Sequence, residues 1–323
     1  AVDPDTGLLF GRRAGSLYVI APRGGQPPAP EPPLPELLPQ EYAVAHLVIS
    51  PKFANDNTLL AVSGENIYRS TDGGQRWKRL QGGLPQGQGS TWVVAFSPDY
   101  AADRTLFAGG NHSEYWGEGV WKSQDGGDTW GAQWANLAHR RITGFYFAPD
   151  FAANKTMVAQ AKFYDVASGV SGDSYQQSVD GGVTWTLAVT GNVSTAAGQT
   201  PLPPVSELLP GYTAPPNRPT NITNQGSSLQ VTLDGSTWIT PSLALAEGDW
   251  LYAVLASPQY PSDPTLYVFG NRSLWRSTDN GATWAGWDDA RLQALDYTNH
   301  MSAAAVSPPL GDGTYRLVIG TAN

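Results

Sequence analysis

One short phrase recurs along the chain and limits what the chain can fold into. It first reads Ser70-Thr-Asp-Gly-Gly-Gln-Arg-Trp77. Later copies begin at Ser123, Ser178 and Ser277, and a shortened copy spans Thr232–Trp238. Their aspartates, Asp72, Asp125, Asp180, Asp234 and Asp279, are separated by 53, 55, 54 and 45 residues. A nearly constant period of this size indicates a repeat architecture.

The chemistry of the phrase predicts a hairpin turn followed by a strand. Asp-Gly between β-type segments favours a tight turn, because glycine adopts positive φ without steric cost. The Ser hydroxyl and the Asp carboxylate can bond to backbone N–H groups and fix the turn. The Trp then opens the next strand and buries a large apolar surface. The Trp residues assigned to this structural role are Trp77, Trp130, Trp185, Trp238 and Trp284.

This phrase resembles the Asp-box, or BNR repeat, Ser-x-Asp-x-Gly-x-Thr-Trp. Families that carry it, such as sialidases and sortilins, are β-propellers with the box at the outer turn of each blade. The resemblance implies that the boxes here are structural and lie away from the ligand-binding end. It also resembles the phrases of compact, non-catalytic propellers such as the Ycf48-like photosystem II assembly factors.

A decayed copy of the phrase at the start of the chain predicts how the repeat closes. Residues 7–20 align without gaps with residues 119–132, with Arg13 in place of the Asp. They supply two outer strands, and residues 301–323 supply the matching inner strands. Pairing of the two ends would remove exposed sheet edges. The expected fold is all-β, a single β-propeller of six four-stranded blades whose last blade is closed by the N- and C-terminal strands.

The expected organisation is one domain, residues 1–323. Its complete blades span 42–80, 91–134, 142–189, 190–240 and 250–287, although 190–226 has poor strand patterning. Residues 21–41 are rich in proline and predict an extended strap. Its Glu36-Leu-Leu-Pro39 is echoed by Glu207-Leu-Leu-Pro210. Each copy is either a strap packed on the propeller or an exposed docking peptide, and we favour the strap because paired leucines avoid water.

Composition excludes several functions. A net charge of −9 argues against general binding of nucleic acids or anionic membranes. There is no long apolar run to span a membrane and no Cys for disulfides or thiolate metal sites. We expect no cofactor and no metal. Because the chain opens at Ala1 without a basic-then-apolar signal, we expect a processed, exported protein, secreted or at the cell surface.

Propeller geometry divides the loops between two faces. Turns between strands one and two, and the boxes between strands three and four, lie on one face. Blade-to-blade links and loops between strands two and three lie on the other, here named the loop face, where aromatic and charged residues gather and a ligand is expected. The candidate binding residues are Trp92, His112, Glu114, Tyr115, Trp116, His139, Arg140, Arg141, Tyr164, Asp165, Asp249, Trp250, Arg272 and His300.

Catalysis is not favoured. Sialidases carry an early Arg-Ile-Pro motif, which is absent here, so none of their catalytic residues can be assigned. A glycoside hydrolase using two loop-face carboxylates remains an alternative, with Glu114, Glu118, Asp165, Asp173 and Asp249 as candidates. A structural subunit of a surface layer or filament, self-associating through the proline-rich segments, is another. The preferred function is a non-catalytic binding or scaffold propeller for a protein or glycan partner.

Overall fold

The computed structural model describes residues 43–85, 91–111, 117–133, 140–165, 169–191, 201–213, 248–287 and 299–322. It also describes the shorter pieces 2–3, 8–9, 17–20, 222–225, 228–232, 238–240 and 294–296 and the single residues 137, 243 and 292. Within these residues the protein consists mainly of antiparallel strands gathered into six sheets.

The sheets follow one another along the chain. Sheet 1 contains β4 (Val44–Ile49), β5 (Leu59–Ser63), β6 (Asn66–Ser70) and β7 (Lys78–Leu80). Sheet 2 contains β8 (Thr91–Phe96), β9 (Leu106–Asn111), β10 (Gly117–Ser123) and β11 (Gly131–Gln133). Sheet 3 contains β12 (Arg140–Phe147), β13 (Met157–Asp165), β14 (Val170–Ser178) and β15 (Thr186–Gly191).

Three more sheets complete the described structure. Sheet 4 contains β16 (Ile222–Gln225), β17 (Ser228–Thr232) and β18 (Trp238–Ile239). Sheet 5 contains β19 (Leu251–Ala256), β20 (Leu266–Gly270), β21 (Leu274–Ser277) and β22 (Ala285–Gly286). The closing sheet runs in the order β1 (Val2–Asp3), β2 (Leu8–Leu9), β3 (Leu17–Ile20), β24 (Leu317–Thr321) and β23 (Met301–Val306).

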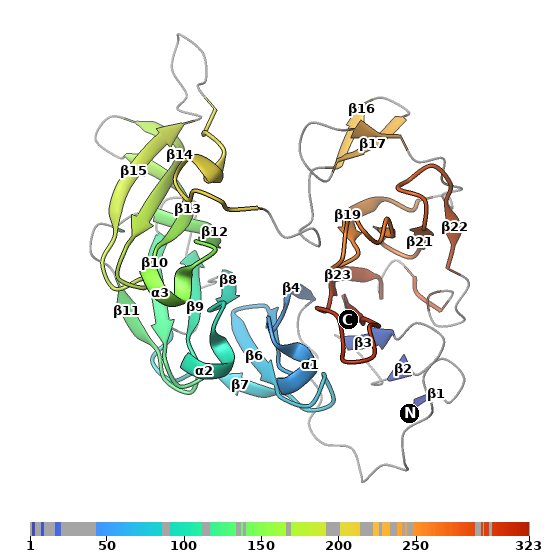
Figure 1. The fold of residues 1–323 in the computed structure, drawn as a ribbon, viewed down its shortest axis with the longest axis horizontal. Coiled ribbons are helices and arrows are strands. Elements are labelled where there is room, and N and C mark those ends of the chain that lie inside the picture. Colours follow the sequence, from blue (N-terminus) through green and yellow to red (C-terminus); the bar gives the residue numbers. More distant parts are fainter. Residues whose placement is uncertain are drawn as a thin grey trace.

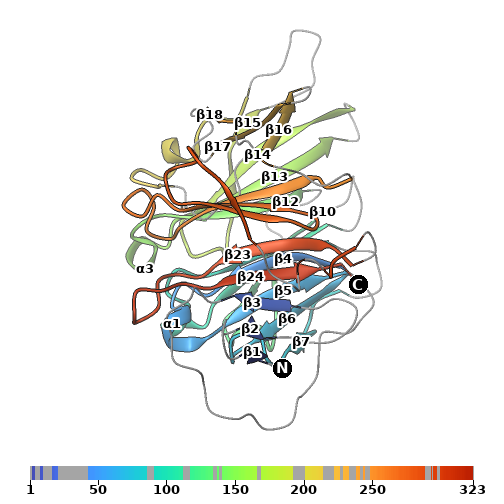
Figure 2. The same ribbon diagram turned by 90° about the vertical axis from the view of Figure 1, so that its right-hand side faces the viewer.

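The closing sheet confirms that the two ends of the chain meet. β3 pairs with β24 in antiparallel register, with Val19 opposite Val318 (Figure 2). The closing sheet has five strands rather than the four predicted, and sheet 4 has three strands within the described residues, where a fourth strand stays a prediction. The number of blades in the complete ring stays a prediction.

The sheets pack through their faces. In Figure 1 the first strands β4, β8, β12, β19 and β23 lie toward the middle and the last strands β7, β11, β15 and β22 toward the rim. Neighbouring first strands contact each other, as β23 does with β4 and β4 with β8. The second strands β5, β20 and β24 are buried along their whole length, because sheets cover both of their faces.

Short helices fill the turn between the first and second strands of sheets 1–3. They are α1 (Phe53–Asp56), α2 (Tyr100–Asp103) and α3 (Phe151–Asn154). In the first, Asp56 accepts a hydrogen bond from Ser50 Oγ at 2.6 Å and one from Thr58 N at 2.9 Å. Asp103 repeats both contacts in sheet 2. These carboxylates therefore stabilise the turns between the first and second strands.

The second Glu-Leu-Leu-Pro segment is a packed strap. Residues 201–213, which contain the 3-10 helix η1 (Val205–Glu207), lie against the face of sheet 3. Leu209 is 0% exposed and packs with Val158 and Tyr175. Gln177 Nε2 also donates to Leu208 O at 3.3 Å. The strap prediction is confirmed for this copy, while residues 21–41, with the first copy, lie outside the described residues.

Candidate functional site

The described copies of the repeated turn close through bonds between their own residues, as sheet 2 illustrates. In sheet 2, Ser123 Oγ accepts from Gly127 N at 2.8 Å and donates to Asp125 Oδ1 at 2.8 Å. Asp125 also accepts from the backbone and hydroxyl of Thr129. Trp130 Nε1 donates to Gly127 O at 2.9 Å. The turn is thus fixed by its own side chains, as its sequence indicated.

The bonds from Ser Oγ to the Asp carboxylate and from the Gly N–H to Ser Oγ recur around the other described aspartates of the phrase, Asp72, Asp180 and Asp279. Trp77 and Trp185 are buried, and Trp284 is partly buried. Asp234 lies outside the described residues, and Trp238 is described only through its backbone in β18. The repeated phrase is therefore structural wherever it can be seen.

The turns of the phrase share one face with the short helices. Gly73 N, in the turn of sheet 1, donates to Asn57 O at 2.9 Å, directly after α1. Gly126 N makes the same bond to Arg104 O after α2, and Gly181 N to Lys155 O after α3. We name this side the turn face. In Figure 2, α1 and α3 lie on the left and the C-terminus lies on the right.

The loop face brings four of the expected site residues together. Asp249 and Trp250 directly precede β19, Arg272 lies in the turn between β20 and β21, and His300 directly precedes β23. The indole of Trp250 and the imidazole of His300 meet edge to face, with ring centroids 5.8 Å apart. We name these four residues the Trp250 cluster.

Backbone bonds through Asn271 hold this cluster. Trp250 N donates to Asn271 Oδ1 at 3.0 Å, and Asn271 N donates to Trp250 O at 2.9 Å. Met301 N donates to Asn271 O at 2.7 Å, which ties the start of β23 to the same turn. Asn271 joins three segments that are distant in sequence. It was not among the expected binding residues.

The carboxylate of Asp249 is held by hydrogen bonds at the edge of the Trp250 cluster. It accepts hydrogen bonds from Ser273 Oγ and from Arg272 N, the latter at 3.2 Å. Burial raises the pKa of the Asp249 carboxyl, and the Arg272 N–H and guanidinium oppose this effect. Ser273 is a second contributor that the sequence did not single out. The carboxylate is thus fixed beside a cation rather than free to turn.

In contrast to Asp249, Trp250 is open to solvent. Trp250 is 50% exposed, whereas Trp77, Trp130 and Trp185 of the repeated turns are buried. The backbone bonds at both its N–H and its carbonyl keep the residue in place. The result is a held aromatic surface with a carboxylate and a guanidinium nearby.

A second group of expected residues meets on sheet 3. The guanidinium of Arg140 lies 4.8 Å from the centre of the Phe163 ring, on the neighbouring strand. Burial lowers the pKa of Arg140, and Asp165 opposes this effect. Arg141 and Tyr164 lie on the same pair of strands and are partly buried. This group belongs to the loop-face ends of β12 and β13.

The remaining expected residues divide into two sets. Trp92 is only 1% exposed, and its Nε1 donates to Glu65 O at 2.8 Å. It therefore packs in the core and holds the β5–β6 turn, which corrects its expected place on the binding surface. The others, His112, Glu114, Tyr115, Trp116 and His139, lie outside the described residues.

No group of three or more His, Asp or Glu side chains among the described residues is placed to hold a metal ion. Across those same residues, no helix combines the length and the apolar character needed to cross a membrane.

Several solved structures match the chain at low sequence identity. The chain matches YCF48 from Cyanidioschyzon merolae at 14% identity, with 88% of this chain and 96% of that chain covered and a TM-score of 0.41. It matches an α-L-arabinofuranosidase from Fusarium graminearum at 13% identity, with 87% and 93% covered and a TM-score of 0.43.

The chain also matches an ancestral GH74 enzyme at 16% identity and a TM-score of 0.39, covering 80% of this chain and 34% of that chain. It thus spans about a third of that enzyme's length. No curated protein matches the sequence. The family model of the DUF6242 beta propeller domain matches residues 39–201, half of the chain. The chain therefore belongs to the DUF6242 beta propeller family.

Proposed function

We propose that this propeller is a non-catalytic binding module whose loop face carries the ligand site. The observation that supports it is Trp250, a half-exposed indole held by two backbone hydrogen bonds. An indole that is half exposed and fixed by its backbone presents a large, ordered apolar surface, and aromatic anchors of this kind often carry most of the binding free energy at an interface. Asp249 and Arg272 beside it offer hydrogen bonds and charge to the rim of a bound partner.

The proposed ligand is a glycan or a protein surface. An indole face packs well against the C–H face of a sugar ring or against an apolar side chain. The neighbouring carboxylate and guanidinium bond equally to sugar hydroxyls or to backbone groups. We further propose that residues 1–323 act as one domain, because β3 and β24 join the two ends, and that the protein is exported.

The test is equilibrium binding to immobilised oligosaccharides and to a peptide library, comparing the native chain with Trp250→Ala. Removing a central aromatic anchor costs about 2 kcal/mol or more, so binding should weaken by about 30-fold. Leu187→Ala is the matched control, because Leu187 is 52% exposed but lies on β15, outside the Trp250 cluster. Equal binding by both variants and the native chain would refute the proposed site.

Two further assays separate this proposal from a glycoside hydrolase and from a structural subunit. A glycoside hydrolase needs two carboxylates about 5–10 Å apart, and the candidates Asp165 and Asp173 lie on sheet 3, whereas Asp249 precedes sheet 5. Release of reducing ends from a bound glycan, abolished in Asp249→Asn, would establish an enzyme instead. Self-association that is lost when residues 22–41 are deleted would establish a structural subunit.

A further inference from the structure

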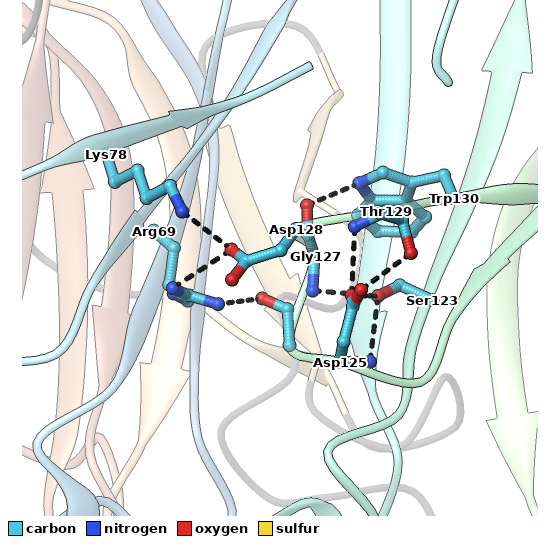
Figure 3. A network of polar contacts seen from close by, with 9 residues as sticks. Arg69, Lys78, Ser123, Asp125, Gly127, Asp128, Thr129 and Trp130 are labelled. Atoms are coloured by element: carbon cyan, nitrogen blue, oxygen red, sulfur yellow. Dashed lines mark hydrogen bonds and ion pairs between the residues drawn. The ribbon is translucent and has the colours of Figure 1, made fainter. Parts of the chain in front are cut away.

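A carboxylate joins sheets 1 and 2 at the turn face. Arg69, on β6, donates to Gly126 O and lies 3.3 Å from Asp128 Oδ1 (Figure 3). Lys78, on β7, places its Nζ 2.9 Å from the same oxygen. Asp128 belongs to the repeated turn of sheet 2, so its carboxylate is held between two cations of the preceding sheet.

The next junction, between sheets 2 and 3, keeps a cation and lacks the carboxylate. When the repeats are aligned on the phrase, Lys122 is equivalent to Arg69, Gly131 to Lys78, and Val183 to Asp128. The ammonium of Lys122 still reaches the turn of the next sheet, 3.7 Å from where a Cβ on Gly181 would lie. The cationic half of the junction is therefore retained without its partner.

The ammonium of Lys122 is under-compensated. It lies partly buried, 6.0 Å from the centre of the Phe107 ring. Among the described residues, no carboxylate oxygen comes within 4.0 Å of its Nζ. Burial lowers the pKa of Lys122, and the more distant Asp180 and Asp103 only oppose this effect. An anion placed against this ammonium would gain a charge-assisted hydrogen bond.

A shallow hollow lies beside Lys122. It has a volume of about 300 Å³ and is lined by Lys122, Gln124, Asp125, Thr129, Gly131 and Gln133. A Cβ added to Gly131 would meet no atom closer than 3.7 Å, so the space that Lys78 fills at the preceding junction is open here. The amides of Gln124 and Gln133 add hydrogen-bond donors to the lining.

Asp125 is the one acidic group in this lining, and it does not bar an anion. Hydrogen bonds from Thr129 and Ser123 outweigh its partial burial and hold its pKa at about 2, so it is ionised. Its two oxygens are already bonded within the turn. Asp72 has the same place in the turn of sheet 1, where Asp128 nevertheless binds the cations.

We propose that this hollow binds a carboxylate, seated against Lys122 as Asp128 is seated against Arg69 and Lys78. The carboxylate belongs either to a small organic acid or to an acidic side chain of a partner protein. This site lies at the turn face and is separate from the Trp250 cluster. Its existence does not depend on the function proposed for the loop face.

The first experiment is an NMR titration of the full chain with acetate at constant ionic strength, with chloride as the reference anion. Amide shifts of Gly131 and Gln133 should saturate with acetate, and Lys122→Met should weaken binding by about tenfold or more. Lys78→Met is the matched control and should leave acetate binding unchanged. Shifts that chloride reproduces, or that Lys122→Met retains, would overturn the proposal.

A parallel titration distinguishes the two sources. The capped peptide acetyl-Gly-Asp-Gly-amide is compared with acetate, and its Asn counterpart serves as the uncharged control. Tighter binding of the acidic peptide than of acetate assigns the site to a partner's side chain, and the reverse assigns it to a free acid. Equal binding of the acidic and the Asn peptides would contradict a carboxylate site.

A second variant fills the site from within. Val183→Asp places a carboxylate at the position of Asp128, whereas Val179→Asp places one elsewhere on the same exposed turn. Val183→Asp should abolish acetate binding and raise the urea midpoint above that of Val179→Asp. Unchanged acetate binding in Val183→Asp would refute the geometry, whether or not Lys122→Met folds.

Discussion

The serine of the repeated turn should contribute more to the free energy of unfolding where the backbone N–H that it accepts from is buried. Ser123 Oγ accepts from Gly127 N at 2.8 Å, and both groups are buried. Ser70 Oγ accepts from Gly74 N at the same distance, but Gly74 is only partly buried. Substitution by alanine removes the acceptor in each case, and only Gly74 can then bond to water.

The magnitude follows from this difference. Leaving a buried donor unsatisfied costs about 1–3 kcal/mol, whereas losing a hydrogen bond that water can replace costs about 1 kcal/mol or less. Ser123→Ala should therefore lower the free energy of unfolding by up to about 3 kcal/mol. Ser70→Ala should lower it by about 1 kcal/mol, because solvent replaces most of the lost bond.

The assay is urea unfolding followed by tryptophan fluorescence, with the slope of the transition checked for constancy. Ser171→Ala is the control, because Ser171 is exposed on β14 and its loss should change stability by less than about 0.5 kcal/mol. Equal costs for Ser123→Ala and Ser70→Ala would refute the reasoning from burial. A cost below about 1 kcal/mol for Ser123→Ala would refute the structural role of the turn.

The other two predictions concern acid and the strap. Hydrogen bonds hold the pKa of Asp125 and of Asp180 at about 2, against an ordinary value of 3.8. The stability that these two ionised carboxylates contribute is therefore complete above about pH 4 and is lost as the pH falls toward 2. Asp125→Asn should reduce the fall in the free energy of unfolding over this pH range, as measured by urea unfolding. Leu209→Ala should lower the free energy of unfolding by about 2–5 kcal/mol, because Leu209 is fully buried against sheet 3. Glu207→Ala is the control and should leave this free energy nearly unchanged, because Glu207 is exposed. Equal stability of the two variants in urea unfolding would show that the strap is not part of the core.

Much of the scaffold could be predicted because the bonds that hold each repeated turn are formed between residues of the phrase itself. The Ser, Asp and Gly of each turn bond to each other within a few residues, so the sequence contains the whole network. The alignment that placed Arg13 at an Asp position also predicted that the N-terminal strands join the last sheet, as β3 and β24 do. Local chemistry and a counted period were sufficient for both.

The candidate site could be predicted only in part, because it depends on contacts between distant segments. Assigning loops to a face correctly grouped Asp249, Trp250, Arg272 and His300, although they span more than one sheet. The same rule placed Trp92 on the binding surface, but its indole turns inward to Glu65. A strand residue at the edge of a face can point either way, and the sequence does not record which.

The hollow beside Lys122 was missed for a different reason. Gly131 and Val183 are not among the residues that define the repeated phrase, so the phrase itself does not point to them. Only the neighbouring junction, where Lys78 and Asp128 meet, shows what these two positions lack. Comparing equivalent positions between repeats would have found this signal.

The most direct test is to measure the affinity of a ligand for the native chain and for Trp250→Ala, and to analyse the chemical structure of the ligand before and after incubation with each. We predict that the native chain binds a glycan or peptide reversibly and returns it chemically unchanged, and that Trp250→Ala binds it about 30-fold more weakly. Cleavage of the ligand by the native chain, or full binding by Trp250→Ala, would contradict a non-catalytic binding site on the loop face.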